Sequence, residues 1–245
     1  MTTLQDLKDK LSALRLKSMS EPLGTVMEHA VQHNLALPTT LSRLADLELA
    51  QRLHNAIALR WRPSKLTDKL TIDQFDFSHH KSRHEQKTRI LNLLNLAFAR
   101  AHLDVMLMGN PGAGQTFLAK CLAYAACNAN IKVLFTTAID MINHLMAAEA
   151  DRSLLKKLQY YQAPELLVCA ELGYLSLGQQ GSPLCFQVIS GRQQLKSSVI
   201  TTNLPCVDWG KVFDSTTVAT AIADRLVYNS EVLILGGSSD RRKLT

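Results

Sequence analysis

The residues with the clearest chemical potential form a glycine-rich turn, Gly109-Asn110-Pro111-Gly112-Ala113-Gly114-Gln115-Thr116. The apolar run 105–108 precedes this turn, and Phe117 continues the chain after it. Glycines permit positive φ angles, so backbone N–H groups can close around phosphate oxygens. A helix that begins near Gln115 would add the positive end of its dipole. The spacing therefore predicts a phosphate-binding turn between a buried strand and a helix, with a purely structural turn as the alternative.

One residue departs from the P-loop pattern G-x-x-x-x-G-K-[ST], because Gln115 stands where the pattern has lysine. An amide can donate hydrogen bonds but is neutral, so a charge-assisted bond worth about 1.5–3 kcal/mol is lost. Lys120 is a poor substitute, since it lies about 140° around the helix and roughly 7.5 Å further along it. Thr116 remains where a hydroxyl would coordinate Mg²⁺.

A second group of candidate residues follows two later strands. The strand 166–170 leads into Glu171, which could polarise a water molecule. The preceding position, which holds a metal-binding aspartate in P-loop ATPases, is Ala170, and Cys169 points to the other face of the strand. Asn203 follows the strand 198–202, where it could orient a water near the γ-phosphate or simply terminate the strand before Pro205.

Alternating strands and helices must position these residues. Apolar strands over 132–136, 166–170, 198–202 and 232–235 are separated by helices over 138–149, 151–161, 182–195 and 215–229. Such strands predict an α/β fold with a parallel sheet covered by helices on both faces. A ligand belongs at the carboxyl ends of its strands, where the glycine-rich turn, Glu171 and Asn203 all fall.

The first hundred residues have a different pattern. Leucines at helical spacing over 3–17, 23–31 and 38–57 predict a small all-α module within residues 1–62, with these leucines as its core. Residues 63–88 form a basic linker in which Phe75 and Phe77 are interleaved. These aromatics either belong to a phosphate-tracking surface or anchor the linker onto the next domain. Residues 89–245 complete the P-loop domain, beginning with a helix over 90–100.

Charge points to an acidic partner. The chain has a net charge of +6, and residues 1–100 contain 15 Lys/Arg against 10 Asp/Glu. This distribution is expected if the first part meets DNA, although a solvated helical surface is the alternative. His79, His80 and His84 lack the carboxylate or cysteine pattern of a metal site and are expected to be solvated.

The remaining composition indicates a cytoplasmic protein without a membrane partner. No apolar stretch approaches the ~20 residues of a membrane span, and the first residues are not a signal peptide. Five cysteines form no C-x-x-C pair and are expected to be reduced, buried thiols: Cys121, Cys127, Cys169, Cys185 and Cys206.

Together these segments resemble the IstB-like AAA+ ATPases, the helper proteins of insertion-sequence transposition, and also their relative, the replicative helicase loader. The run 109–119 resembles the Walker A segment, and Ala170-Glu171-Leu172-Gly173-Tyr174-Leu175 resembles the Asp-Glu-Leu-Gly-Tyr Walker B segment. The run 200–205 resembles the sensor strand. Asp224-Arg225-Leu226 resembles the motif whose arginine reaches the nucleotide of a neighbouring subunit.

The resemblance implies ATP or ADP and Mg²⁺ as ligands, a homo-oligomer on DNA, and a partner transposase. It also implies catalytic roles for Glu171, Asn203 and Arg225. The departures include Gln115, Ala170, Gly191 and the segment 237–241. Since phosphoryl transfer depends on positioned positive charge and metal, we expect hydrolysis to be very slow or absent. A nucleotide-independent scaffold and a decayed mobile-element product are the alternatives.

Overall fold

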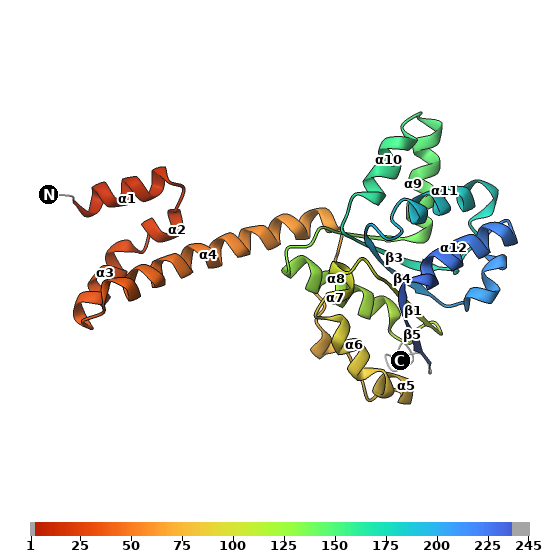
Figure 1. Cartoon of the computed structure of the whole chain (residues 1–245), viewed down its shortest axis with the longest axis horizontal. Helices are drawn as coiled ribbons and strands as arrows, with labels where there is room; N and C mark the ends of the chain where they lie inside the picture. The colour runs from red at the N-terminus through yellow and green to blue at the C-terminus, as the bar shows by residue number, and fades with distance from the viewer. Residues whose placement is uncertain (1–2, 237–245) are drawn as a thin grey trace. The chain divides into compact units, whose positions relative to one another are not determined.

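The computed structural model describes residues 3–236, and the C-terminal segment 237–241 noted above lies outside the described residues. The chain forms two compact units, Met1–Leu59 and Arg60–Thr245. Figure 1 labels the α-helices and most of the strands of the two units. The boundary falls within one long helix, α4 (Leu37–Trp61), close to the expected boundary at residue 62.

The first unit contains α1 (Leu4–Ala13), α2 (Lys17–Ser20), α3 (Leu23–Gln32) and most of α4. The Thr3 hydroxyl accepts a hydrogen bond from the Asp6 backbone, and the Asp6 carboxylate accepts one from the Thr3 backbone, which fixes the start of α1. A single helix over 3–17 was wrong. Arg15 has a φ of 60°, a left-handed conformation that ends α1 and separates it from α2.

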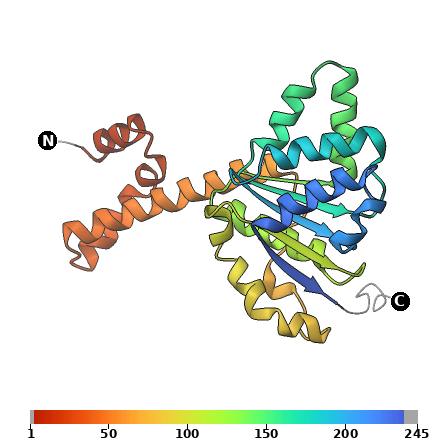
Figure 2. The same ribbon diagram turned by 45° about the vertical axis from the view of Figure 1, so that its right-hand side comes forward.

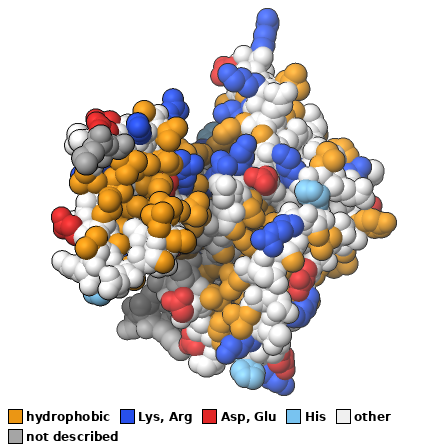
Figure 3. All heavy atoms as spheres, turned by 60° about the vertical axis from the view of Figure 1, so that its left-hand side comes forward, with side chains coloured by type: hydrophobic (Ala, Val, Ile, Leu, Met, Phe, Trp, Pro, Cys, Tyr) orange, Lys and Arg blue, Asp and Glu red, His pale blue; other side chains and the backbone are white. Residues whose placement is uncertain are grey.

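The core of this unit is smaller than the leucine pattern predicts. Leu23, Val26 and Leu44 are buried, with Leu11 and Met19 packed against them. A unit of this size buries little of its surface, so most of its leucines are exposed. An apolar groove of about 500 Å³ results, and Figure 3 shows hydrophobic side chains gathered on this unit. Leucines expected in the core are exposed at positions 4, 7, 14, 41, 47 and 53.

Residues 60–100 form short elements that pack on the P-loop domain. These are η1 (Arg62–Ser64), η2 (Ile72–Gln74), α5 (Lys81–Glu85), α6 (Lys87–Leu93) and α7 (Ala97–Arg100). The helix expected over 90–100 is interrupted, because Leu96 is left-handed with a φ of 59°. Phe75 is buried, its ring centroid 5.0 Å from that of Phe77 and 5.7 Å from that of Phe117. The aromatics therefore anchor this segment, as the second interpretation expects.

The rest of the second unit is a five-stranded parallel sheet between layers of helices (Figure 2). Its strands are β1 (Asp104–Gly109), β2 (Val133–Thr137), β3 (Leu166–Leu172), β4 (Ser197–Thr202) and β5 (Ser230–Leu235), in the order β2-β3-β4-β1-β5. The helices are α8 (Gln115–Asn128), α9 (Ala138–Ala150), α10 (Leu154–Gln162), α11 (Gly178–Ser190) and α12 (Thr216–Tyr228), and the 3₁₀ segment η3 (Cys206–Lys211) precedes α12. The predicted α/β fold is confirmed.

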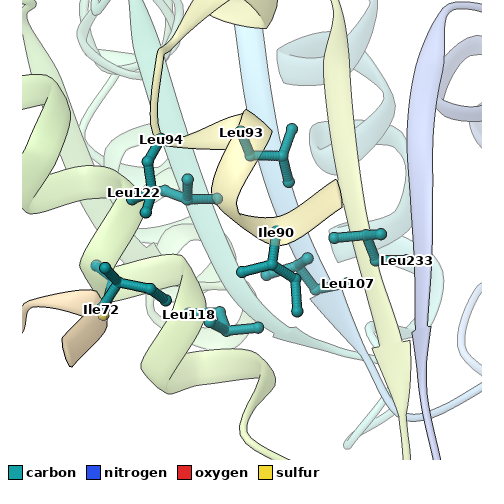
Figure 4. A pocket seen from close by; sticks show the side chains of 9 residues that line it. Ile72, Ile90, Leu93, Leu94, Leu107, Leu118, Leu122 and Leu233 are labelled. Carbon is teal, nitrogen blue, oxygen red and sulfur yellow. The ribbon is translucent and has the colours of Figure 1, made fainter. Parts of the chain in front are cut away.

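The two faces of the sheet bury separate hydrophobic clusters. Helices α9 to α12 cover the face that contains Cys169, whereas α6 to α8 cover the face that contains Val168. The expectation that Cys169 points to the other face of the strand from position 170 agrees with this alternation, because its neighbour Val168 lies in the other cluster. The second cluster is tightly packed: the cavity in Figure 4 measures about 10 Å³, its lining is apolar, and its side chains include Ile90, Leu107 and Leu118.

A buried arginine forms hydrogen bonds at the edge of the sheet where the strands begin, opposite the glycine-rich turn. Helix α11 ends at Ser190 rather than at 195, and the turn that follows carries Arg192, which is 1% exposed. Its guanidinium donates to the carbonyls of Tyr161, Gln162, Pro164 and Ser197. Nearby, Asp104 Oδ1 accepts a hydrogen bond of 2.6 Å from the Ser198 backbone. Burial raises the pKa of Asp104 to about 6.

The expectation of buried thiols holds for every cysteine except Cys206, which is only partly buried. All five are free and four are buried, and burial raises the pKa of Cys121 and of Cys169 to about 12. Within residues 3–236, no helix has both the length and the apolar character needed to cross a membrane.

Candidate nucleotide-binding site

The glycine-rich turn connects β1 to α8 at the carboxyl end of the sheet. Gly112 and Gly114 have φ angles of 83° and 96°, so both occupy the left-handed region that side chains disfavour. Gly109 is constrained differently, because a Cβ there would overlap the carbonyl oxygen of Leu235 on β5. Gly114 directly precedes Gln115, the first residue of α8. The turn therefore has the backbone of a phosphate cradle at a helix N-terminus.

Gln115 is folded into this cradle and is 5% exposed. Its Nε2 donates to the carbonyl oxygens of Gly109 at 2.5 Å and of Asn110 at 3.2 Å. The amide thus satisfies loop carbonyls without bringing a charge to the site. Lys120 does not replace it, because its Nζ lies 2.5 Å from Asp68 Oδ2 and the resulting hydrogen bond lowers the pKa of that carboxyl.

A pocket of about 480 Å³ lies beside the turn, a volume typical of small-molecule sites. It brings together Gly112, Gly114, Gln115, Thr116, Phe117 and Glu171, all of which the sequence singled out. Its lining also contains Gln74, Phe75, Asp76, Arg83 and Tyr174. Of these additions, the sequence identified Arg83 only as one cation in a basic segment. Nothing in its spacing separates a buried arginine from its exposed neighbours.

Glu171 reaches the pocket from the end of β3 through an irregular backbone. Its φ is 65°, and the pairing of β3 with β4 shifts register between Cys169 and Leu172. The backbone N–H of Glu171 donates to Thr201 Oγ1 at 2.9 Å, while its side chain is exposed. Ala170 is 1% exposed and lies opposite Thr137 of β2. The strand end therefore offers a carboxylate at position 171 and an apolar, buried side chain at position 170.

Asn203 is adjacent to this strand end. Because β4 lies between β1 and β3, the residue that follows Thr202 falls between the turn and Glu171. Asn203 Oδ1 is buried and has no hydrogen-bond partner, and it would lie 3.3 Å from a Cβ on Gly173. Its side chain is not among the described groups that line the pocket.

Comparison with known proteins agrees with this geometry. Residues 9–245 match the family described as IstB-like ATP binding protein. The chain belongs to this family. The ATP-binding protein of insertion sequence IS5376 from Geobacillus stearothermophilus is 34% identical over 93% of this chain and 90% of that protein. The corresponding IS21 protein from Pseudomonas aeruginosa is 30% identical over 98% of this chain and 90% of that protein.

Solved structures support the fold of the IstB-like chain. The DnaC helicase loader superposes with a TM-score of 0.58 and 22% identity, over 67% of this chain and 96% of that one. AMPPCP-bound DnaA from Aquifex aeolicus has a TM-score of 0.58 and 14% identity, over 70% of this chain. The match spans about half of that DnaA chain, at 51%. The sheet and its helices thus have the same fold as these two proteins.

Arg225 lies apart from the pocket of its own chain. It is on α12, where Nη1 donates to the Ala221 carbonyl at 2.9 Å and the guanidinium lies 4.6 Å from the ring centroid of Phe186. Its Nε is buried without a hydrogen-bond partner. Arg225 is not among the described residues that line the pocket beside the turn.

The residues present fit the two expected ligands unequally. A polyphosphate fits, because Gly112 and Gly114 give the turn the positive φ angles of a phosphate cradle and a pocket of about 480 Å³ lies beside it. For Mg²⁺, the chain offers the Thr116 hydroxyl, whereas Ala170 has no ligand atom. Among residues 3–236 there is no cluster of three or more His, Cys, Asp or Glu side chains that could hold a metal.

Proposed function

We propose that this IstB-like protein binds ATP or ADP at the turn 109–116 and acts with a transposase on target DNA, with ATP hydrolysis impaired. The observation that carries the proposal is the neutral, inward-folded amide of Gln115 in an otherwise complete phosphate cradle. Family membership and the relatives named as ATP-binding proteins of insertion sequences support it.

Binding is expected to survive because the cradle acts mainly through its backbone. The N–H groups of the turn, the dipole of α8 and the Thr116 hydroxyl would hold the phosphates. The Thr116 hydroxyl would also hold Mg²⁺, whose charge would offset that of the phosphates. Thr116 would hold this ion weakly, because the neighbouring strand end presents the methyl group of Ala170, which has no ligand atom.

Turnover is expected to suffer more than binding. Glu171 would orient an attacking water, Asn203 would assist it, and Arg225 would reach the nucleotide of a neighbouring subunit in a homo-oligomer. Without a positioned lysine and a firmly held metal, however, charge on the transferring phosphoryl group lacks its main stabilisation. These groups would therefore be in place with little catalytic effect.

The two restoring substitutions, Gln115→Lys and Ala170→Asp, test this proposal. We expect the double variant to hydrolyse ATP at least a hundredfold faster than the natural chain, measured as phosphate release, since each change restores a transition-state charge. Each single variant is the matched control and should gain less. A natural chain that already hydrolyses ATP as fast as the double variant would contradict the proposal.

A nucleotide-independent scaffold is the second candidate. The hydrogen bonds from Gln115 to the loop carbonyls favour it, because they satisfy part of the turn without a ligand. Measuring ATP affinity with Mg²⁺ present separates the two candidates. DNA or transposase binding that persists while no ATP binding is detected would favour the scaffold.

The partner surfaces are proposed from charge and exposure. Residues 1–62 would serve as the partner-binding module, which the exposed leucines around the groove of the first unit support. The basic excess would contact DNA. Residues 1–59 contain six Lys/Arg and six Asp/Glu, whereas residues 60–100 contain nine and four, so the excess lies in the second segment.

A further inference from the structure

The pocket beside the glycine-rich turn has an unusual charge balance. Its described lining contains the carboxylates of Asp76 and Glu171, and Arg83 is its basic residue. In a P-loop with the usual lysine, a second cation would offset these carboxylates. Here Gln115 leaves Arg83 as the positive charge of the lining, which matters because a nucleotide triphosphate is highly anionic.

Arg83 is held firmly against the turn and is 1% exposed. Its Nε donates to the Ala113 carbonyl at 3.1 Å, and its Nη1 donates to the Asp76 carbonyl at 3.1 Å. The guanidinium also lies 4.6 Å from the ring centroid of Phe75. A Cβ on Gly114 would approach its Nη2 to 3.0 Å, so the cation is in contact with the backbone of the turn.

The bond to Ala113 also orients the turn. In a trans peptide the carbonyl and the following N–H point in opposite directions. Because Arg83 takes the Ala113 carbonyl on its side, the N–H of Gly114 points away from the guanidinium. An N–H group that points away in this way is free to bind a phosphate oxygen. Arg83 thus acts on the cradle through the peptide that joins Ala113 to Gly114.

We propose that Arg83 is the positioning residue of the phosphate cradle: it fixes the Ala113–Gly114 peptide from behind and offsets the carboxylates of the lining, so that the pocket accepts a polyphosphate despite Gln115. This inference rests on the proposed nucleotide binding. It assigns to a residue outside the motif, 32 positions before Gln115 in the chain, part of the work expected of a P-loop lysine.

Arg83→Met and Arg83→Lys in the full chain test the inference. Methionine keeps an unbranched side chain next to Phe75 but removes the charge and the donors, whereas lysine keeps the charge. We expect Arg83→Met to weaken ATP binding at least tenfold and adenosine binding less than twofold, measured by titration calorimetry. Arg83→Lys should recover part of the ATP affinity. Lys87→Met is the matched control, since Lys87 lies 5.4 Å from the ring centroid of Phe77, outside the described lining.

A second background sharpens the test. With Gln115→Lys present, the turn has its own cation, so Arg83→Met should weaken ATP binding by less than it does in the natural chain. Equal losses for ATP and adenosine, or no loss, would overturn the role of Arg83 while leaving nucleotide binding intact. Loss of the fold in both Arg83 variants, monitored by circular dichroism, would assign the residue to stability alone. A natural chain that binds no ATP would overturn the proposed function together with this inference.

Discussion

At the level of single residues, the site depends on which side chains are absent. Gly109 allows β5 to pass at a distance that any Cβ would prevent, and Gly112 and Gly114 adopt angles that few other residues tolerate. Gln115 and Ala170 are each accommodated without an unpaired charge, because the amide bonds to loop carbonyls and the methyl group is buried. The chemistry of the site has therefore changed without disturbing its frame.

Gly109→Ala tests the close approach of β1 and β5. The added Cβ would overlap the Leu235 carbonyl, so the strands must separate, and we expect the free energy of unfolding to fall by about 3 kcal/mol. Gly210→Ala is the control, since its Cβ would meet nothing closer than Thr216 Oγ1 at 3.9 Å. Urea denaturation of both variants measures the difference. Equal stability of the two variants would contradict the structure of the turn.

At the level of elements, local backbone conformations decide where helices end and what they expose. Left-handed residues such as Arg15 and Leu96 interrupt helices that the hydrophobic pattern alone would continue. Because α11 ends early, Arg192 lies in the turn that follows and its side chain is buried. Its N–H groups donate hydrogen bonds to four carbonyl oxygens and to the Ser198 hydroxyl. This arginine connects three segments at the edge of the sheet opposite the pocket.

The buried carboxyl of Asp104 makes stability depend on pH. Its pKa in the folded chain, about 6, exceeds the ordinary value of 3.8, so the folded state binds its proton more tightly than the unfolded state does. The stabilisation is fully present below pH 3.8 and is lost as the pH rises towards 6. Relative to Asp104→Asn, the natural chain should lose up to about 3 kcal/mol between pH 4 and pH 7, measured by urea denaturation.

An exposed carboxyl provides the control for this prediction. Asp151, at the end of α9, lies on the surface and is changed to asparagine in the control variant. If Asp104→Asn and the natural chain showed parallel pH profiles, the raised pKa of Asp104 would be disproved.

At the level of the whole molecule, the basic excess and the leucine-lined groove fall on different units. The first unit is neutral overall and exposes leucines, whereas the basic excess follows Arg60. Several of these cations lie over aromatic rings while remaining exposed, including Lys65 near Tyr160 and Lys69 near Trp61. An exposed cation held in this way can still meet a phosphate backbone.

A fragment of residues 60–245 tests whether the proposed DNA contacts lie on the second unit. It contains the second compact unit, so we expect it to fold, and to keep the salt dependence of DNA binding shown by the full chain. Fluorescence anisotropy across a salt series measures the slope of the logarithm of affinity against that of salt. A slope that falls by more than about one for the fragment would place DNA contacts on the helical unit instead.

Much of this protein follows from sequence because its signals are local. Continuous apolar strands, glycines at fixed spacing and a lysine replaced by Gln115 are visible in the chain, and they predicted the parallel sheet, the cradle and the missing charge. The grouping of Glu171 with the turn followed from the rule that strand ends meet at one edge of a sheet.

Long-range packing decided the rest. Whether a leucine of the first unit is buried depends on how many partners a small unit can supply, which no periodicity states. Likewise, nothing in the local sequence distinguishes Arg83 or Arg192 from an exposed arginine. Only the folded backbone brings carbonyl oxygens around each guanidinium. Sequence determines which groups the chain possesses, while tertiary structure determines which of them leave water, because burial depends on contacts between segments far apart in the chain.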